Sequence, residues 1–102
     1  MKVKRAKKWM NRDQLDQAVE CLKAMAHPMR LQILQLLCHS RYTVGELATA
    51  CEIVGPVASQ HLRLLERSGL LVGKREGKFV YYQLAEPHIA TLLTLIEAHF
   101  GG

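Results

Sequence analysis

The sequence predicts a small, mainly α-helical domain with one β-hairpin, which places it in the α+β class. Apolar residues recur at helical spacing through most of the chain, and two β-branched or aromatic runs flank Glu76-Gly77-Lys78. The 102 residues have room for one modest core. Apolar residues make up 49% of the chain, which excludes a disordered protein. No apolar run reaches the roughly 18 residues that a membrane span needs.

The positive charge of the chain is concentrated at its N-terminus. The formal net charge is +5, and residues 1–12 hold six basic side chains and no acidic one, whereas residues 13–102 have a net charge of −1. We therefore divide the chain into a basic arm, 1–12, and a folded domain, 13–102. The arm suits nucleic acid or an anionic membrane surface, and a solvated tail is the alternative. No apolar segment follows it, so we expect a cytoplasmic protein rather than a secreted one.

Three helices are expected in the first half of the domain. Apolar residues recur at helical spacing from Asp13 to Ala26, and Pro28 both ends this helix and suits the first turn of the second. Thr43-Val-Gly-Glu46 is a capping box, in which the two side chains bond opposite backbone donors. This box opens a short third helix over about Val44–Cys51. The apolar face of the second helix is formed by Leu31, Ile33, Leu34 and Leu37.

A fourth helix is expected from Pro56 to Gly69, after a short break at Glu52–Gly55. Its apolar side chains turn to one side, and the other side has few hydrophobes. A recognition helix in a DNA major groove needs such a polar side, because its first turns reach base edges while its cations neutralise phosphates. Taken alone, this side is also typical of a solvated helix. Its members are Pro56, Ser59, Gln60, Arg63 and Arg67.

A basic hairpin and a last helix complete the domain. Leu70–Arg75 and Phe79–Leu84 are the two predicted strands, with Gly77 at the bend, and Glu86-Pro87 opens the last helix. The order α-α-α-α-β-β-α is that of a winged helix–turn–helix. A cationic hairpin tip in this fold can lie along the phosphate backbone or enter the minor groove. The cations at the tip are Lys74, Arg75 and Lys78.

Four segments match a known pattern in order and spacing. They are MAHPMRLQIL (25–34), TVGELA (43–48), SQHLRLLERSGLL (59–71) and KREGKFVYY (74–82). They closely resemble the ArsR/SmtB family of bacterial winged helix–turn–helix repressors, over about residues 18–100. The resemblance implies a homodimer, joined mainly through its first and last helices, that binds palindromic operator DNA and is released by an inducer. Val54-Gly55 departs from the family's usual Ser-Gln, and a lost N-cap costs about 1 kcal/mol.

The resemblance also allows effector sites to be compared residue by residue. The cysteine pair of the third-helix metal site falls on Val44–Ala48, which contains no thiol, and the last helix contains no cysteine for a dithiol switch. The last-helix zinc site matches Glu86, His88 and His99 at three of its four ligand positions. His88 and His99 lie about 16 Å apart along one helix, so only an antiparallel pair of subunits could bring them to one zinc or similar ion. The alternative is two partly exposed histidines beside a dimer seam.

The function that these observations favour is a homodimeric, sequence-specific DNA-binding repressor without catalytic activity. We expect Ser59, Gln60 and Arg63 to approach bases and Val57 to touch a thymine methyl group. The phosphate contacts are expected from Arg67, Lys74, Arg75 and Lys78, with Lys7 and Lys8 added by the arm.

The sequence favours two other classes of function less than this one. A winged-helix module that binds protein instead of DNA is the alternative, and its DNA affinity would not respond to salt. An enzyme is not expected, because the chain has no triad order, paired carboxylates or Walker-type motif. Cys21, Cys38 and Cys51 are widely spaced and odd in number, so we expect small buried hydrophobes rather than a disulfide framework.

Overall fold

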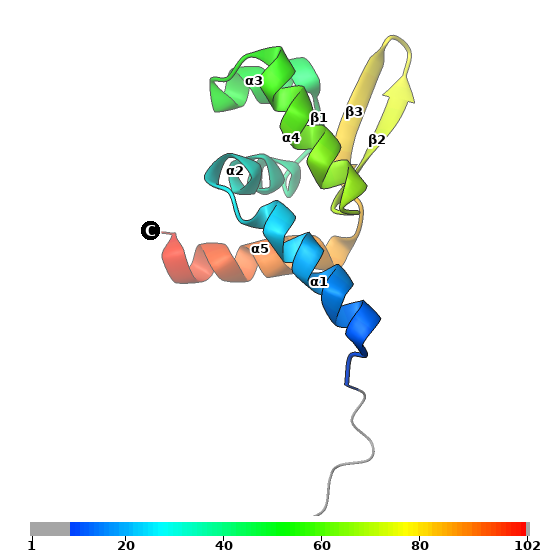
Figure 1. Cartoon of the computed structure of the whole chain (residues 1–102). Coiled ribbons are helices and arrows are strands. Elements are labelled where there is room, and N and C mark those ends of the chain that lie inside the picture. The colour runs from blue at the N-terminus through cyan, green and yellow to red at the C-terminus, as the bar shows by residue number, and fades with distance from the viewer. Residues whose placement is uncertain (1–8, 102) are drawn as a thin grey trace, which may run out of the picture.

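The computed structural model describes residues 9–101, so Lys7 and Lys8 of the arm lie outside the described residues. Within this range five helices and three strands follow one another, and the predicted fold class is confirmed. Figure 1 shows α3, α4 and the β2–β3 hairpin at one end of the molecule and α1 and α5 at the other. The elements are α1 (Arg12–Met25), α2 (Pro28–Leu37), β1 (Tyr42–Thr43), α3 (Val44–Cys51), α4 (Gly55–Arg67), β2 (Leu71–Glu76), β3 (Phe79–Leu84) and α5 (Pro87–Phe100).

Local signals in the sequence fix the helix ends. The predicted capping box is present, with the Thr43 hydroxyl accepting from the Glu46 amide at 3.2 Å and the Glu46 carboxylate accepting from the Thr43 amide at 2.9 Å. Asn11 and Gln14 form a second capping box at the start of α1, which was not predicted. The predicted bounds differ from the observed ones by one or two residues, since α4 runs from Gly55 to Arg67 rather than from Pro56 to Gly69.

The core joins α2 to the helix–turn–helix formed by α3 and α4. Five large side chains of these helices are less than 2% exposed, and burying each contributes about 1.5–3 kcal/mol. Because they come from three successive helices, α4 is held rigidly with its polar side outward. These five are Ile33, Leu34, Leu47, Leu62 and Leu65.

The sheet has three antiparallel strands in the order β1-β3-β2. The hairpin pairs Leu71 with Leu84 at its base and Glu76 with Phe79 at its tip, and the bend residue Gly77 has a φ of 64° as the turn requires. The predicted order α-α-α-α-β-β-α lacked β1, which pairs Thr43 with Tyr81. Two residues are too few to show an alternating pattern, so this strand exists only through its long-range pairing.

Two helices leave apolar side chains uncovered. In α1 only Ala24 and Met25 are buried, although the whole helix is amphipathic. In α5 Ile89 and Leu93 are buried, but the predicted stripe does not continue inward, because Phe100 is 81% exposed. The exposed apolar residues, which we call the α1/α5 apolar surface, are Leu15, Val19 and Leu22 of α1 and Leu92 and Leu95 of α5.

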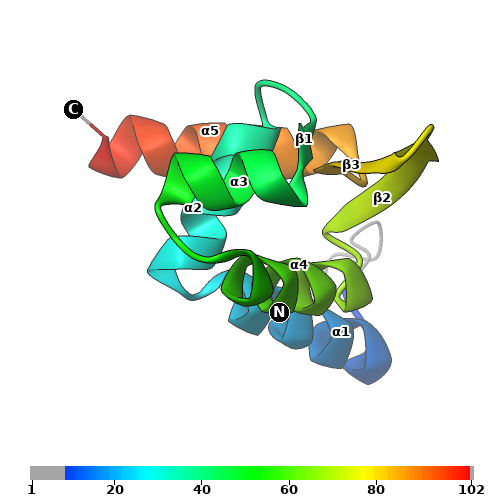
Figure 2. The same ribbon diagram turned by 90° about the horizontal axis from the view of Figure 1, so that it is seen from above.

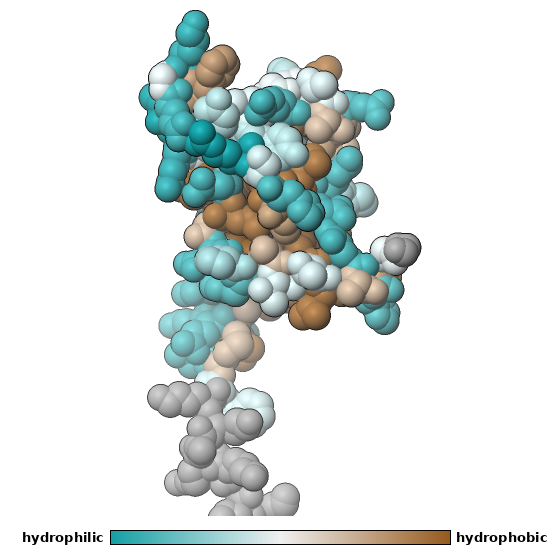
Figure 3. Space-filling model, turned by 180° about the vertical axis from the view of Figure 1, so that it is seen from behind, coloured by the Kyte–Doolittle hydropathy of each residue, from teal (hydrophilic) through white to brown (hydrophobic). Residues whose placement is uncertain are grey.

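The two halves of this surface lie on different sides of the molecule. Figure 1 places α1 and α5 below the helix–turn–helix, and Figure 2, seen from above, shows α5 along one side of the molecule and α1 along the other. The space-filling view from behind shows apolar surface across the middle of that face, bordered by hydrophilic residues (Figure 3). None of the described helices is both long and apolar enough to cross a membrane.

Candidate nucleic-acid interface

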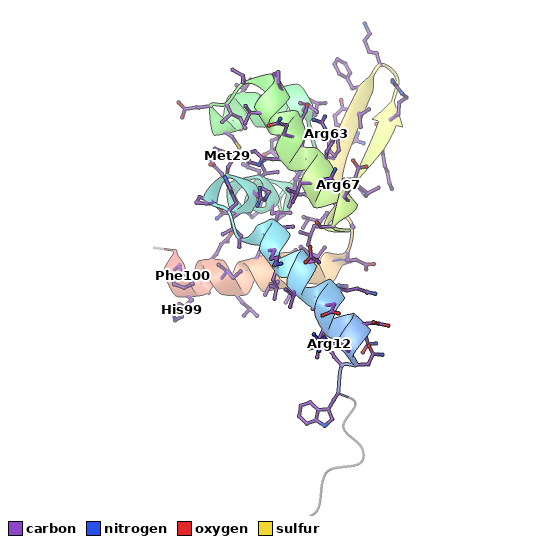
Figure 4. The ribbon with its side chains drawn as sticks, in the orientation of Figure 1. Arg12, Met29, Arg63, Arg67, His99 and Phe100 are labelled. Atoms are coloured by element: carbon purple, nitrogen blue, oxygen red, sulfur yellow. The ribbon has the colours of Figure 1, made fainter. Side chains whose placement is uncertain are left out.

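The outer side of α4 carries the side chains that the sequence predicted for DNA. Ala58, Leu62 and Leu65 face the core, whereas Gln60, Arg63 and Arg67 are exposed. Figure 4 shows Arg63 and Arg67 on successive turns of α4, next to the hairpin. Of the remaining predicted contacts on α4, Ser59 is half-buried and Val57 is 37% exposed. The polar side of α4 is therefore accessible along its whole length.

The cations of α4 and of the hairpin tip are not neutralised by carboxylates. Within residues 9–101 the ion pairs of arginine and lysine involve Arg12, Lys23 and Arg41. Arg75 donates only to the carbonyl of Gly77, at 3.1 Å. Cations without an acidic partner are available for phosphate oxygens. The set consists of Arg63, Arg67, Lys74, Arg75 and Lys78, and all five are exposed.

The hairpin presents two different faces. Side chains alternate along a strand, so Tyr82 and Tyr81 of β3 point to opposite sides. Tyr82 lies toward α4: burial and the carboxylate of Glu66 raise the pKa of its hydroxyl, and the guanidinium of Arg63 lowers it. Gly73, its partner on β2, provides the room, because a Cβ there would lie 3.1 Å from the Tyr82 ring. The face of the hairpin that carries Tyr82 is thus turned toward α4.

The other face of the hairpin contacts Arg41, which was not among the predicted site residues. Its guanidinium lies 4.2 Å from the centre of the Tyr81 ring and donates to the carboxylate of Glu76 at the tip. This hydrogen bond raises the pKa of Arg41 and lowers that of Glu76. Arg41 and Glu76 are 35 residues apart, so no local pattern could have indicated their contact.

The N-terminus of α4 lacks a side-chain cap, whereas the N-terminus of α3 has one. Val54 occupies the N-cap position in an extended conformation, is 65% exposed and makes no capping hydrogen bond, as the sequence predicted. Pro56 in the first turn removes one unsatisfied amide and presets φ. The remaining amides at this end carry the positive end of the helix dipole, which favours an approaching anion.

The three predicted metal ligands do not come together in one protomer. His88 and Glu86 lie at the start of α5, with Nδ1 3.9 Å from a carboxylate oxygen, whereas His99 lies at the opposite end beside Phe100. Among the described residues no group of three histidine, cysteine or acidic side chains is close enough to hold a metal ion. A single protomer therefore does not fit a zinc ion.

The three cysteines are free thiols in separate surroundings. Cys51 is buried, and Cys21 and Cys38 are partly buried against the core. Burial raises the pKa of Cys38 and Cys51, and the carboxylate of Glu97 adds to the effect at Cys38. A raised pKa keeps a thiol protonated and slow to react, which agrees with the expected packing role.

Comparison with known proteins places this arrangement in a class. Residues 27–72 match the family model "Bacterial regulatory protein, arsR family". The transcriptional repressor SmtB of Mycobacterium tuberculosis is 40% identical over 90 residues, which cover 88% of this chain and 67% of that protein. The transcriptional activator HlyU of Vibrio cholerae is 39% identical over 80 residues, covering 78% of this chain and 74% of HlyU.

Solved structures agree with the sequence matches. A structure of HlyU from Vibrio cholerae superposes with a TM-score of 0.82 and 34% identity, covering 91% of this chain and all of that one. A homodimeric winged helix–turn–helix DNA-binding domain from Mycobacterium bovis, a possible ArsR-family regulator, superposes with a TM-score of 0.80 and 35% identity. The match covers 90% of this chain and 87% of that one. The fold and the exposed basic face define a winged helix–turn–helix transcription regulator rather than an enzyme. The chain belongs to the ArsR family of bacterial regulatory proteins.

Proposed function

We propose that this chain is a cytoplasmic, homodimeric repressor that binds a palindromic operator and leaves it when an effector binds. One observation carries the proposal. The elements that carry the five unpaired cations, α4 and the hairpin, lie at one end of the molecule, and α1 and α5, which carry the two halves of the α1/α5 apolar surface, lie at the other. One end suits DNA and the other suits a second protomer.

In the proposed complex α4 enters the major groove. Ser59, Gln60 and Arg63 approach base edges, and Val57 contacts a thymine methyl group. The hairpin follows the flanking backbone, where phosphates are contacted by Arg67, Lys74, Arg75 and Lys78. The basic arm, 1–12, adds further charge next to the folded domain, 13–102. The unpaired state of the cations supports this assignment, because no internal ion pair has to be broken on binding.

The second protomer is proposed to cover the α1/α5 apolar surface. An isolated helix of about 12–15 residues is marginal in water, and α1 has 14 residues with only its last two buried. Exposure of Leu95 at 64% and Leu22 at 57% leaves apolar area that a partner would remove from water. A symmetric dimer places two copies of α4 on successive major grooves, about 34 Å apart.

Two substitutions in the full-length protein test the DNA contacts. Operator sequences are first selected from a random duplex library with the wild-type protein. Replacing Arg63 with alanine is expected to weaken operator binding by about 1–3 kcal/mol and to relax base preference, whereas Lys78→Ala weakens all duplexes about equally and reduces the salt slope by about one unit. Lys23→Ala, which removes a cation from an ion pair on α1, is the control. A DNA affinity that changes neither with salt nor with Arg63→Ala or Lys78→Ala would favour the protein-binding alternative.

The effector is proposed to belong to one of two classes. A divalent metal such as zinc needs Glu86 and His88 of one subunit and His99 of a second subunit, because α5 separates the two histidines within a protomer. A non-metal or redox signal is the other class. Burial raises the pKa of Cys38 and Cys51, so neither of these two thiols is activated for a redox signal.

A further inference from the structure

We propose that Arg41 is a positioning residue for the wing: it holds Glu76 and so fixes the hairpin tip relative to the helix–turn–helix. The inference rests on the proposed DNA-binding function and adds a residue outside both α4 and the hairpin. It is carried by the contacts of Arg41 with Tyr81 and with Glu76, on the face of the hairpin opposite to α4.

The hairpin tip needs such a contact because little else supports it. The short strand β1 pairs with β3 only at Tyr81 and Tyr82, so beyond this point β2 and β3 have no third strand. A two-stranded hairpin is marginally stable in water. Phe79 at the tip is 53% exposed, and Lys74, Arg75 and Lys78 are also exposed. Arg41 is the described residue outside the hairpin that hydrogen-bonds to its tip.

Arg41 is connected through the backbone to the start of the helix–turn–helix. It precedes β1 directly, and β1 runs into Thr43, the N-cap of α3. The guanidinium of Arg41 lies over the Tyr81 ring and also donates a hydrogen bond to the Glu76 carboxylate. Two contacts therefore define the orientation of the Arg41 side chain. The hairpin therefore lies between α4, which packs against β2, and Arg41, which contacts Tyr81 of β3.

The contact also affects the charge that the wing presents. Glu76 is the acidic residue of the tip, among Lys74, Arg75 and Lys78. Paired with Arg41, its carboxylate is neutralised within the protein. Without Arg41, the same carboxylate would be left unpaired beside the DNA phosphates and would repel them. Both consequences of the pair, the fixed tip and the neutralised carboxylate, favour DNA binding without requiring Arg41 to touch DNA.

A double-mutant cycle separates this role from a direct phosphate contact. Arg41→Gln, Glu76→Gln and the double variant are compared in the full chain on one selected duplex. We expect Arg41→Gln to weaken binding about fivefold in the wild-type background and less than about twofold in the Glu76→Gln background. An equal loss of DNA affinity in both backgrounds would show instead that Arg41 contacts a phosphate directly. No loss of affinity in either background would show that Arg41 has no role in DNA binding. Lys23→Gln is the matched control, because it also removes the cation of an exposed ion pair, here the pair of Lys23 with Glu20 on α1.

A second measurement needs no DNA and so stands apart from the proposed function. Hydrogen exchange of the amides at the hairpin tip, residues 74–80, is followed in the free protein. Arg41→Gln is expected to speed exchange at the tip and to leave the base of the hairpin, near Leu71 and Leu84, unchanged. The charge-swapped pair Arg41→Glu with Glu76→Arg is expected to restore slow exchange. Exchange at the tip that stays at the wild-type rate in Arg41→Gln would overturn the positioning role whatever the DNA affinity.

Discussion

The imidazole rings of His27 and His61 lie with their centres 4.9 Å apart and connect the start of α2 to α4. His27 is the N-cap of α2, and its Nδ1 accepts a hydrogen bond from the Met29 amide at 3.1 Å. His61 sits on the inner side of α4. Burial lowers the pKa of His61, and the nearby His27 and Arg30 lower it further. The packing of α4 on α2 therefore favours an uncharged His61.

Stability is expected to fall at acid pH because of His61. The folded protein binds the proton of His61 less readily than the unfolded chain, whose histidines titrate near pH 6.5. Protonation therefore favours unfolding, and the free energy of unfolding decreases as the pH falls below about 6.5. Above that pH the residue is neutral in both states and adds no pH dependence. Urea unfolding at a series of pH values measures the effect.

The His61→Gln variant isolates this contribution from the other titrating groups. Its free energy of unfolding is expected to depend less on pH between about 5 and 7 than that of the wild type. His39→Gln is the control, because His39 is exposed in the turn after α2. Parallel pH profiles for wild type and His61→Gln would contradict the interpretation.

A serine at Val54 is expected to stabilise the protein by about 1 kcal/mol, because it supplies the missing N-cap of α4. Val54 already has the extended backbone of an N-cap residue, and its side chain is 65% exposed, so the change removes no core contact. Val54→Ala removes the same side chain without adding a cap and is the control. Equal unfolding midpoints in urea for the serine and alanine variants would show that the cap does not form.

The dimer is expected to depend on Leu95. It is 64% exposed on the flank of α5 away from the core, and a charge at this position would have to be buried in the proposed interface. Leu95→Glu is therefore expected to shift the protein toward a monomer and to weaken operator binding, since one protomer reaches one half-site. Thr49→Glu, on the exposed side of α3, is the control. Sedimentation equilibrium measures the shift, and a Leu95→Glu protein that remains dimeric would exclude α5 from the interface.

The sequence predicted those parts of the fold that local chemistry determines. Thr43 and Glu46 signal a helix start by themselves, and Gly77 signals a bend, because their effects act within a few residues. The polar side of α4 was predictable for the same reason, since helical periodicity alone separates Arg63 from Leu62.

The remaining features depend on contacts between distant segments. The pairing of Thr43 with Tyr81 creates β1, and neither residue alone indicates a strand. Arg41 meets Glu76 only after the hairpin has folded beside β1. Periodicity also shows that α1 has an apolar face without showing what covers it, and in the protomer most of that face is uncovered.

Zinc is expected to bind weakly, with no loss on replacing His88 or His99 by alanine. Three donors are one fewer than a closed tetrahedral zinc site requires, and His99 lies at the other end of α5 from Glu86 and His88. Zinc titration of the chelator-free full-length protein, followed by calorimetry, compares the wild type with each alanine variant. Stoichiometric binding that disappears in both variants would show instead that two antiparallel α5 helices complete the site. The same titration with operator DNA present then shows whether zinc binding is coupled to DNA binding. If zinc binds the free dimer more tightly than the DNA-bound dimer, it must weaken DNA binding by the same factor.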